Sequence, residues 1–260
     1  MNFETILYEA GDGIAYITLN RPKKLNAMNA QCIAEMRAAL AEIRADDDVR
    51  VVVLRGAGER AFTAGADISE LADKTPGEME GYNREWLALF DNIEGLAKPV
   101  IASIHGYATG GGTEMSLTCD FVLCAEDCRF GLSEINIGVI PGAGAAVRLT
   151  RWMGRLKAKE ILMLGEFVSG TEAVQCGLAN RAVPAAELAS ITAEWAAKLA
   201  TKAPLALAAA KACVNVGAEA EMPAALEYEL RQFLALFDSE DQKEGMNAFL
   251  EKRQAKFTGR

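Results

Sequence analysis

The chain has 260 residues, of which 51% are hydrophobic and 24% are charged, a composition typical of a globular protein and not of a disordered chain. It carries 27 basic and 36 acidic side chains, so its net charge of −9 excludes the basic surface expected of a non-specific nucleic-acid binder. His105 is the only histidine, which excludes any metal site that needs two histidine ligands.

The N-terminal two thirds of the sequence alternates between short apolar strands and helices. Residues 14–19 form a predicted strand, and a helix is predicted from about Asn29, its N-cap, to the aspartates at 46–48. Three more apolar strands are predicted, each followed by a turn, an extended piece and a helix: residues 51–54, 99–104 and 121–125. This order favours an α/β core over a β-sandwich.

From Thr171 onward the pattern predicts helices throughout. Three of them are expected to follow Pro184, Pro204 and Pro223. The third carries an apolar stripe of Leu226, Leu230, Phe233 and Phe237. The last helix is expected to open at Ser239 with the spacing of a capping box. We therefore expect a core over residues 1–200 and a helical subdomain over 201–260, packed on the core or on a neighbouring subunit.

The cysteines and the apolar segments bear on where the protein resides. The six cysteines form no Cys-x-x-Cys pair, and Cys124 and Cys128 have no histidine near them. Reduced, buried thiols of a cytoplasmic protein are therefore favoured over a zinc site. The N-terminus lacks the pattern of a signal peptide, and the longest uncharged run, residues 99–113, is too short to span a membrane. We expect a cytoplasmic protein with neither a metal ion nor a membrane contact.

Two glycine clusters, at 110–112 and 142–144, precede predicted helices. Neither has the spacing of a P-loop or of a dinucleotide-binding turn, which disfavours a nucleotide site. Tight strand-to-helix turns are one interpretation. The other is an oxyanion site, because the first N–H groups of a helix have no partner within the helix.

Two glutamates are candidates for acid–base chemistry. Glu114 begins a predicted helix, where it either faces solvent near the helix dipole or is buried, as its apolar neighbours indicate. Glu134 is also flanked by apolar residues and is either a buried structural carboxylate or a catalytic group. Two carboxylates in one apolar cleft can divide the acid and base roles. A Ser–His hydrolase is disfavoured because no G-x-S-x-G motif is present, and His105 is expected to be hydrogen-bonded at a strand end.

Four segments resemble motifs of the enoyl-CoA hydratase/isomerase (crotonase) family, in that family's order and spacing between about residues 5 and 257. They are AGADI at 64–68, HGYATGGGTE at 105–114, SEINIGVIPGAG at 133–144 and EGMNAFLEKR at 244–253. The resemblance implies a crotonase-like ββα spiral core with a C-terminal helical subdomain, assembled as homotrimers or as homohexamers made of two trimers. It also implies an acyl-CoA thioester as substrate.

The resemblance assigns roles to five residues. The backbone N–H groups of Ala66 and Gly111 would hold the thioester oxygen, and Gly142 would help to place a water molecule. Glu134 would supply a proton to C2, and Glu114 would help to activate the water. Because both glutamates are present, we expect a 2-enoyl-CoA hydratase without a metal or redox cofactor. Alternatives are a 3,2-isomerase, a hydratase of cyclic enoyl-CoA, and a non-catalytic binding protein on this fold.

The resemblance also implies contacts with coenzyme A. They are Lys23, Lys24, Arg60, Ala64, Asp67, Ile68, Phe249 and Lys252. Of these, Lys23, Lys24 and Arg60 could equally be ordinary surface charges, and Phe249 and Lys252 could instead be a core residue and a surface residue. Phe249 and Lys252 are three apart, hence on one face of the last predicted helix. The chain departs from the family at Ser69, where a lysine is common, and at residues 145–147, where Ala-Ala-Val replaces smaller and polar residues. The acyl preference therefore stays open.

Overall fold

The computed structural model describes residues 3–260. A six-stranded sheet has the order β1-β2-β3-β5-β7-β10, and its neighbouring strands are parallel except for the antiparallel pair β1–β2. Its strands are β1 (Ile6–Gly11), β2 (Ile14–Leu19), β3 (Val51–Gly56), β5 (Val100–Ile104), β7 (Phe121–Ala125) and β10 (Arg181–Val183). The apolar segments predicted as strands are thus confirmed.

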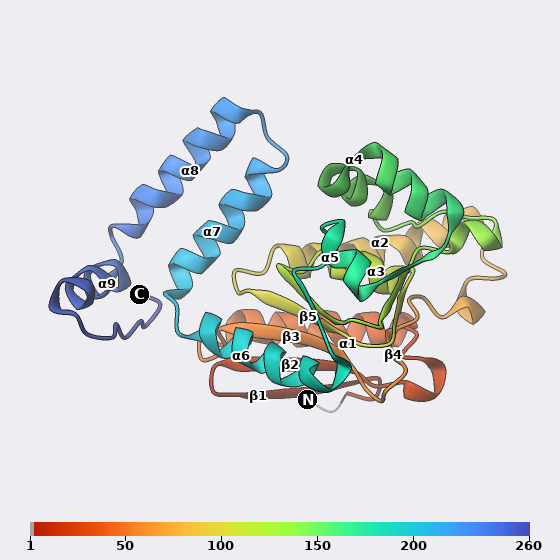
Figure 1. Cartoon of the computed structure of the whole chain (residues 1–260), viewed down its shortest axis with the longest axis horizontal. Coiled ribbons are helices and arrows are strands. Elements are labelled where there is room, and N and C mark those ends of the chain that lie inside the picture. The colour runs from red at the N-terminus through yellow and green to blue at the C-terminus, as the bar shows by residue number, and fades with distance from the viewer. Residues whose placement is uncertain (1–2) are drawn as a thin grey trace.

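A second sheet has the order β4-β6-β8-β9, in which the first three strands are parallel. They are β4 (Ala61–Thr63), β6 (Tyr107–Thr109), β8 (Arg129–Gly131) and β9 (Phe167–Ser169). Strands β3, β5 and β7 each continue into a strand of this second sheet and then into a helix. This repeated ββα unit is the spiral that the resemblance implies (Figure 1).

The helices of the spiral follow the strands in regular order. They are α1 (Ala30–Ala45), α2 (Pro76–Glu94), α3 (Gly111–Ser116), α4 (Ala145–Leu164), α5 (Gly170–Gln175) and α6 (Leu188–Ala200). Short 3₁₀ turns join them at η1 (Pro22–Lys24), η2 (Ile68–Glu70), η3 (Glu134–Ile137) and η4 (Ala185–Glu187). Helix α1 begins as predicted, because the Asn29 side chain accepts a hydrogen bond from the Cys32 N–H at 3.1 Å, and Asp46 ends it.

Some expectations were wrong. A helical pattern throughout after Thr171 is contradicted by β10, which pairs with β7; its three residues are too short to show a period. The Ser239 hydroxyl caps the last helix by accepting from the Gln242 N–H at 3.1 Å, but the Gln242 side chain donates to the Met246 sulfur instead of closing the box. His105 follows β5 and is hydrogen-bonded to the Gly58 backbone as expected, but its Nε2 is buried and has no partner among residues 3–260.

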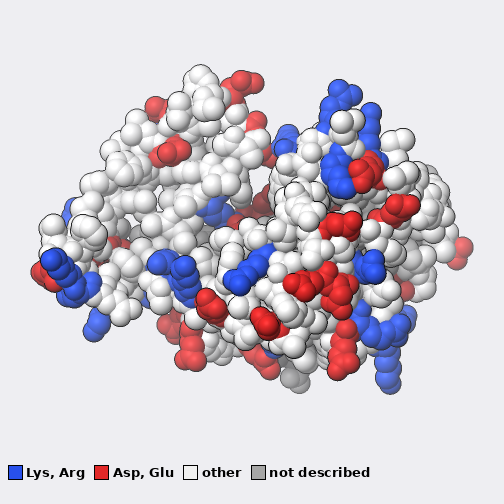
Figure 2. Space-filling view, viewed as in Figure 1, with Lys and Arg blue, Asp and Glu red and all other residues white. Residues whose placement is uncertain are grey.

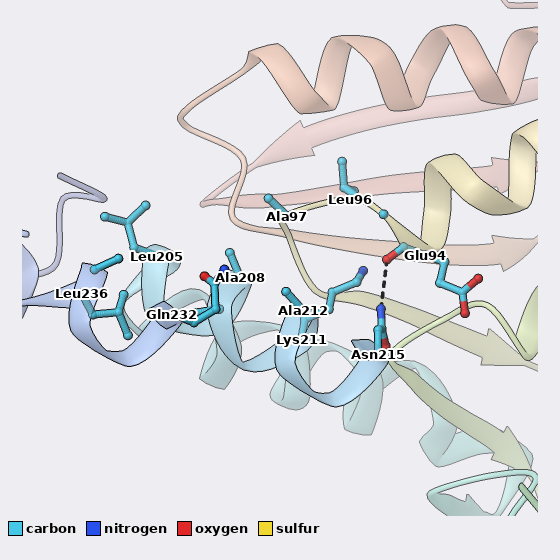
Figure 3. A pocket seen from close by; sticks show the side chains of 13 residues that line it. Glu94, Leu96, Ala97, Leu205, Ala208, Lys211, Ala212, Asn215, Gln232 and Leu236 are labelled. Carbon is cyan, nitrogen blue, oxygen red and sulfur yellow. Dashed lines mark hydrogen bonds between the residues drawn. The ribbon is translucent and has the colours of Figure 1, made fainter. Parts of the chain in front are cut away.

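The last three helices leave the spiral. Helices α7 (Pro204–Gly217) and α8 (Met222–Leu236) pack as a hairpin that projects from the core, and α9 (Glu240–Glu251) lies beside its open end, away from the turn between α7 and α8 (Figure 1). Polar contacts tie α7 to the core. Lys211 Nζ pairs with Asp120 Oδ2 at 2.8 Å, and Asn215 Nδ2 donates to the Glu94 carbonyl at 3.4 Å across a groove of about 450 Å³ (Figure 3).

Much of the hairpin surface is apolar, and Figure 2 shows a largely uncharged area over it. The stripe predicted for the helix after Pro223 lies on α8, and its four members are 37–57% exposed. In the part of the chain that the structure describes, no helix is long and apolar enough to cross a membrane. The same residues contain no group of three or more His, Cys, Asp or Glu side chains that could hold a metal ion.

Candidate active site

One cavity of about 1170 Å³ lies at the carboxyl ends of the parallel strands β4, β6 and β8. The carboxyl edge of parallel strands is the usual place for a ligand, because the loops that leave the strands converge there. All five residues expected to take part in the reaction line this cavity: Ala66, Gly111, Glu114, Glu134 and Gly142. The spiral thus brings together residues that are up to 76 positions apart in the sequence, as Ala66 and Gly142 are.

Two backbone N–H groups are available in this cavity. A Cβ at Gly65 would lie 2.5 Å from the Thr109 carbonyl oxygen and 2.8 Å from the Gly111 nitrogen, so the loops after β4 and β6 touch there. Gly65 has φ +79°, which also favours glycine. Within residues 3–260, neither the Ala66 N–H nor the Gly111 N–H donates a hydrogen bond. Both therefore remain free to bind an oxygen of a ligand.

The indole of Trp86 forms a wall beside Gly111. A Cβ on Gly111 would lie 2.7 Å from the Trp86 ring, and the ring itself is buried and packs edge-on against Phe90 at 5.6 Å. Position 111 therefore has no room for a side chain. Sequence reasoning did not find Trp86, because nothing in the pattern of α2 indicates which of its turns faces the glycine cluster.

Glu114 is buried, with 4% of its surface exposed, so the interpretation of a solvated helix start is wrong. Its Oε1 accepts hydrogen bonds from the Ala143 N–H at 2.8 Å and the Ala145 N–H at 3.2 Å. Burial raises the pKa of Glu114 to about 7, and the charge of Glu134 raises it as well. The two amides and the Arg148 charge oppose this rise in pKa by favouring the carboxylate.

Glu134 begins η3 on the same cavity. Its Oε2 is buried and has no hydrogen-bond partner among residues 3–260, and burial raises the pKa of its carboxyl group. Its Oε1 would lie 2.9 Å from a Cβ at Gly110, where φ is +53°, so glycine is required there on two grounds. A buried carboxyl oxygen without a partner is suited to exchange a proton with a ligand.

The loop of residues 141–145 completes the site opposite Glu114. The N–H of Gly142 donates no hydrogen bond within residues 3–260, whereas its carbonyl accepts one from Asn83 Nδ2 at 2.7 Å. The resemblance pointed to Gly142, but it did not point to Asn83 or to the amides of Ala143 and Ala145. No sequence signal identifies them, because Asn83 is a polar residue on the surface of a helix, and Ala143 and Ala145 act through their backbone N–H groups.

The residues expected to bind coenzyme A are dispersed. Ala64 and Ile68 line the cavity. Asp67 forms ion pairs at 3.1 Å with Arg21 and Lys24, and hydrogen bonding from the Ser69 hydroxyl, followed by these two cations, holds the pKa of Asp67 well below its usual range. Asp67 thus has structural partners. Lys23 and Arg60 are exposed, and neither lines the cavity.

The last helix is distant from the cavity in the single chain. Figure 1 places α9 at the end of the molecule opposite α2 and α4, and neither Phe249 nor Lys252 lines the cavity. Phe249 is 83% exposed and is not a core residue. Lys252 follows the helix in a left-handed conformation, with φ 54°, so the expectation that both residues lie on one helical face is wrong.

Comparison with known proteins agrees with this geometry. The sequence model of the enoyl-CoA hydratase/isomerase family matches residues 9–260. The chain belongs to this family. It is 37% identical over 254 residues to the short-chain-enoyl-CoA hydratase of Clostridium acetobutylicum, covering 98% of this chain and 97% of that one. It is 41% identical over 260 residues to a probable enoyl-CoA hydratase of Rhizobium meliloti, covering 100% of both.

Solved structures of this family confirm the fold. An enoyl-CoA hydratase from Bacillus anthracis superposes with a TM-score of 0.95 at 35% identity, covering 99% of this chain and 100% of that one. An enoyl-CoA hydratase from Geobacillus kaustophilus gives 0.94 at 41% identity, with 99% of each chain covered. The predicted crotonase-like fold and the family resemblance are therefore correct.

Proposed function

We propose that this protein is an enoyl-CoA hydratase, which adds water reversibly to a 2-enoyl-CoA to give a 3-hydroxyacyl-CoA. The observation that carries the proposal is that Glu114 and Glu134 share one cavity with the N–H groups of Ala66 and Gly111, which have no acceptor among residues 3–260. The names of several relatives at 37–41% identity agree with it.

The proposed reaction divides the work among these groups. The N–H groups of Ala66 and Gly111 bind the thioester oxygen and stabilise the negative charge that develops on it. The water oxygen bonds to C3 with the help of Glu114 as base, and Gly142 helps to hold that water. Glu134 delivers a proton to C2. Before the next turnover Glu114 releases the proton it took from the water and Glu134 is reprotonated, so the net addition is one water molecule. No electron is transferred, so we propose that the reaction uses no metal or redox cofactor.

We propose that coenzyme A binds in part through a neighbouring subunit. Lys23, Lys24 and Arg60 are the candidates for the phosphates on the chain's own core, and Ala64 and Ile68 lie at the cavity itself. Phe249 and Lys252 would come from the α9 helix of another copy in a trimer or a dimer of trimers. Residues 1–200 would then perform the reaction, while residues 201–260 would make the subunit and coenzyme contacts. We place the protein in the cytoplasm, which suits its six free cysteines.

Loss of the enoyl-thioester absorbance on mixing the protein with crotonyl-CoA tests the activity. Glu114→Gln keeps the shape of the side chain but removes its charge, and we expect hydration to fall by at least about 100-fold. Slow solvent-deuterium exchange at C2 of butyryl-CoA should survive in Glu114→Gln and disappear in Glu134→Gln. No absorbance change with the parent protein across linear, branched and cyclic substrates would indicate a binding protein instead.

A further inference from the structure

The loop of residues 141–145 is held at one peptide group from both sides. Asn83 Nδ2 donates to the Gly142 carbonyl at 2.7 Å, and the N–H of the same peptide, that of Ala143, donates to Glu114 Oε1 at 2.8 Å. A continuous hydrogen-bond chain therefore runs from the Asn83 amide through a peptide group to the Glu114 carboxylate. Hydrogen bonds in such a chain polarise one another, so the donor at its start strengthens the last bond.

Arg148 holds the next peptide group of the loop. Its Nη1 donates to the Ala143 carbonyl at 3.1 Å, and its Nη2 pairs with Glu94 Oε2 at 2.7 Å. The Arg148 side chain is only 19% exposed. A Cβ at Gly144 would collide with the Arg148 guanidinium, and φ there is +109°, so this turn accepts only glycine.

The sequence of the 141–145 loop does not by itself determine one backbone conformation. Two of its first four residues are glycines, which are the most flexible residues of a chain. Yet the N–H groups of Ala143 and Ala145 both donate to the same oxygen of Glu114. These bonds favour the ionised form of Glu114, which burial disfavours. The order of the loop must therefore come from side chains outside it. Asn83 and Glu94 of α2 and Arg148 of α4 supply it.

We propose that Asn83 and Arg148 are positioning residues, which hold the 141–145 loop so that its N–H groups fix the Glu114 carboxylate for its work on water. The expected effect on kcat rests on the proposed hydratase function, whereas the hydrogen bonds that hold the loop do not depend on it. The charged groups that act on Glu114 are Glu134 from η3 and Arg148 from α4, and Glu94 from α2 pairs with Arg148.

The kinetic test compares Asn83→Ala with Arg84→Ala, the next residue of α2, whose side chain makes only an exposed ion pair with Glu80. We expect Asn83→Ala to lower kcat for crotonyl-CoA by about 10-fold to 100-fold, since small misplacements of catalytic groups have effects of this size. KM should change less than twofold. The rise of kcat/KM with pH should move to higher pH, because the carboxylate loses part of its stabilisation. Arg84→Ala should match the parent protein.

The variants Arg148→Lys and Arg148→Met distinguish the effect of the positive charge of Arg148 from the effect of its two hydrogen bonds. Lysine keeps the positive charge but lacks the planar fork that reaches the Ala143 carbonyl and Glu94 together. We expect both variants to lower kcat, with the larger shift of the pH profile in Arg148→Met. Full activity of Arg148→Lys at every pH would overturn the positioning role of Arg148.

A second measurement does not depend on catalysis. Urea unfolding of the parent and of Asn83→Ala is compared at pH 5 and pH 8, and again in a Glu114→Gln background. Asn83→Ala should be more destabilising at pH 8 than at pH 5, because at pH 8 the carboxylate that it supports is ionised. In the Glu114→Gln background this difference between the two pH values should vanish.

The two measurements distinguish the failure of this inference from the failure of the proposed function. A parent protein that hydrates no enoyl-CoA, yet shows the pH-dependent coupling of Asn83 to Glu114, would refute the hydratase and support the positioning role. An active parent whose Asn83→Ala variant has unchanged kcat, pH profile and coupling would refute the positioning role of Asn83.

Discussion

Gly111 is the first residue of α3, and its backbone N–H has no acceptor among residues 3–260. The indole ring of Trp86 lies directly against its Cα. Gly111→Ala would push the new methyl group against Trp86, and relief of this clash must move either the ring or the N–H. We predict a fall in kcat/KM for crotonyl-CoA of about 100-fold to 1000-fold, the usual effect of losing one oxyanion donor.

Gly81→Ala is the matched control, since a Cβ at Gly81 meets nothing within 4 Å in the middle of α2. It should leave the rate unchanged and stabilise the protein by up to about 1 kcal/mol, because alanine favours helices over glycine. If Gly111→Ala retains the parent rate, its N–H does not bind the thioester oxygen.

The pKa of Glu114 links protonation to stability. Burial raises the pKa of Glu114 from its ordinary value of 4.5 to about 7 in the folded chain, so the folded state binds a proton more tightly than the unfolded state. The stability associated with this proton is fully present below about pH 4.5 and is lost as the pH rises to about 7. Glu114→Gln removes this dependence.

We therefore predict that the melting temperature of Glu114→Gln, relative to the parent, increases from pH 5 to pH 8 by several degrees. Differential scanning fluorimetry at four or five pH values measures it. Glu126→Gln removes the same charge from an exposed position and serves as control. A constant difference between Glu114→Gln and the parent across this range would mean that Glu114 titrates normally in the folded protein.

At this scale the sequence was informative about the glycines and glutamates, because the motifs carry them together. The apolar neighbours of Glu114 indicated its burial as one of two interpretations, but nothing in the sequence indicated its two amide donors. Those donors are 29 and 31 residues away, and they act through their backbones, which leave no trace in the residue type. Asn83 and Arg148 are likewise ordinary polar residues until α2 and α4 are placed beside the loop.

Among the elements, the apolar strands of five or six residues and the amphipathic helices were predictable, because an apolar run or a helical spacing of that length can be recognised in the sequence. Strand β10 was not, because three residues have no period and its conformation is set by pairing with β7. The end of α9 was missed for a related reason. Lys252 adopts φ 54°, a region that favours glycine, and only the backbone contacts of the C-terminal tail show this.

The conformation of Lys252 makes a sharp test of coenzyme binding. Lys252→Ala removes the charge and keeps the Cβ at the left-handed position, whereas Lys252→Gly removes the charge and relieves the strain of a Cβ there. If the charge contacts a phosphate, both variants should raise KM for acyl-CoA severalfold and leave kcat unchanged, since they remove uniform binding. Steady-state kinetics with crotonyl-CoA measures this.

Lys198→Ala on α6 controls for a general loss of positive charge, since Lys198 is an exposed lysine that does not line the cavity. An effect of Lys252→Gly that Lys252→Ala does not share would come from the changed backbone preference at this position. An unchanged KM in both variants would exclude Lys252 from the coenzyme site.

In the molecule as a whole, exposed apolar side chains gather on the hairpin of α7 and α8. The spiral buries its apolar strands on both faces, while the hairpin of α7 and α8 exposes a stripe whose residues sit at helical spacing: Leu226, Leu230, Phe233 and Phe237. An isolated chain would leave this surface in water at a cost of roughly 25 cal/mol per Å² of apolar area. Contiguous exposed patches of this kind usually mark a protein interface.

The last prediction follows from this surface and from the distance of α9 from the cavity. At micromolar concentration, light scattering should give a mass three or six times the 27.9 kDa of the chain. Phe233→Glu, in the centre of the stripe, should shift the mass towards smaller species, because a charge would be buried at the contact. Arg231→Gln, on the same helix but turned away from the stripe, should not, since Arg231 makes an exposed ion pair with Glu227. If α9 of a neighbour contacts coenzyme A, the smaller species of Phe233→Glu should also show a raised KM, and a monomeric parent protein with full activity would refute both the assembly and this contact.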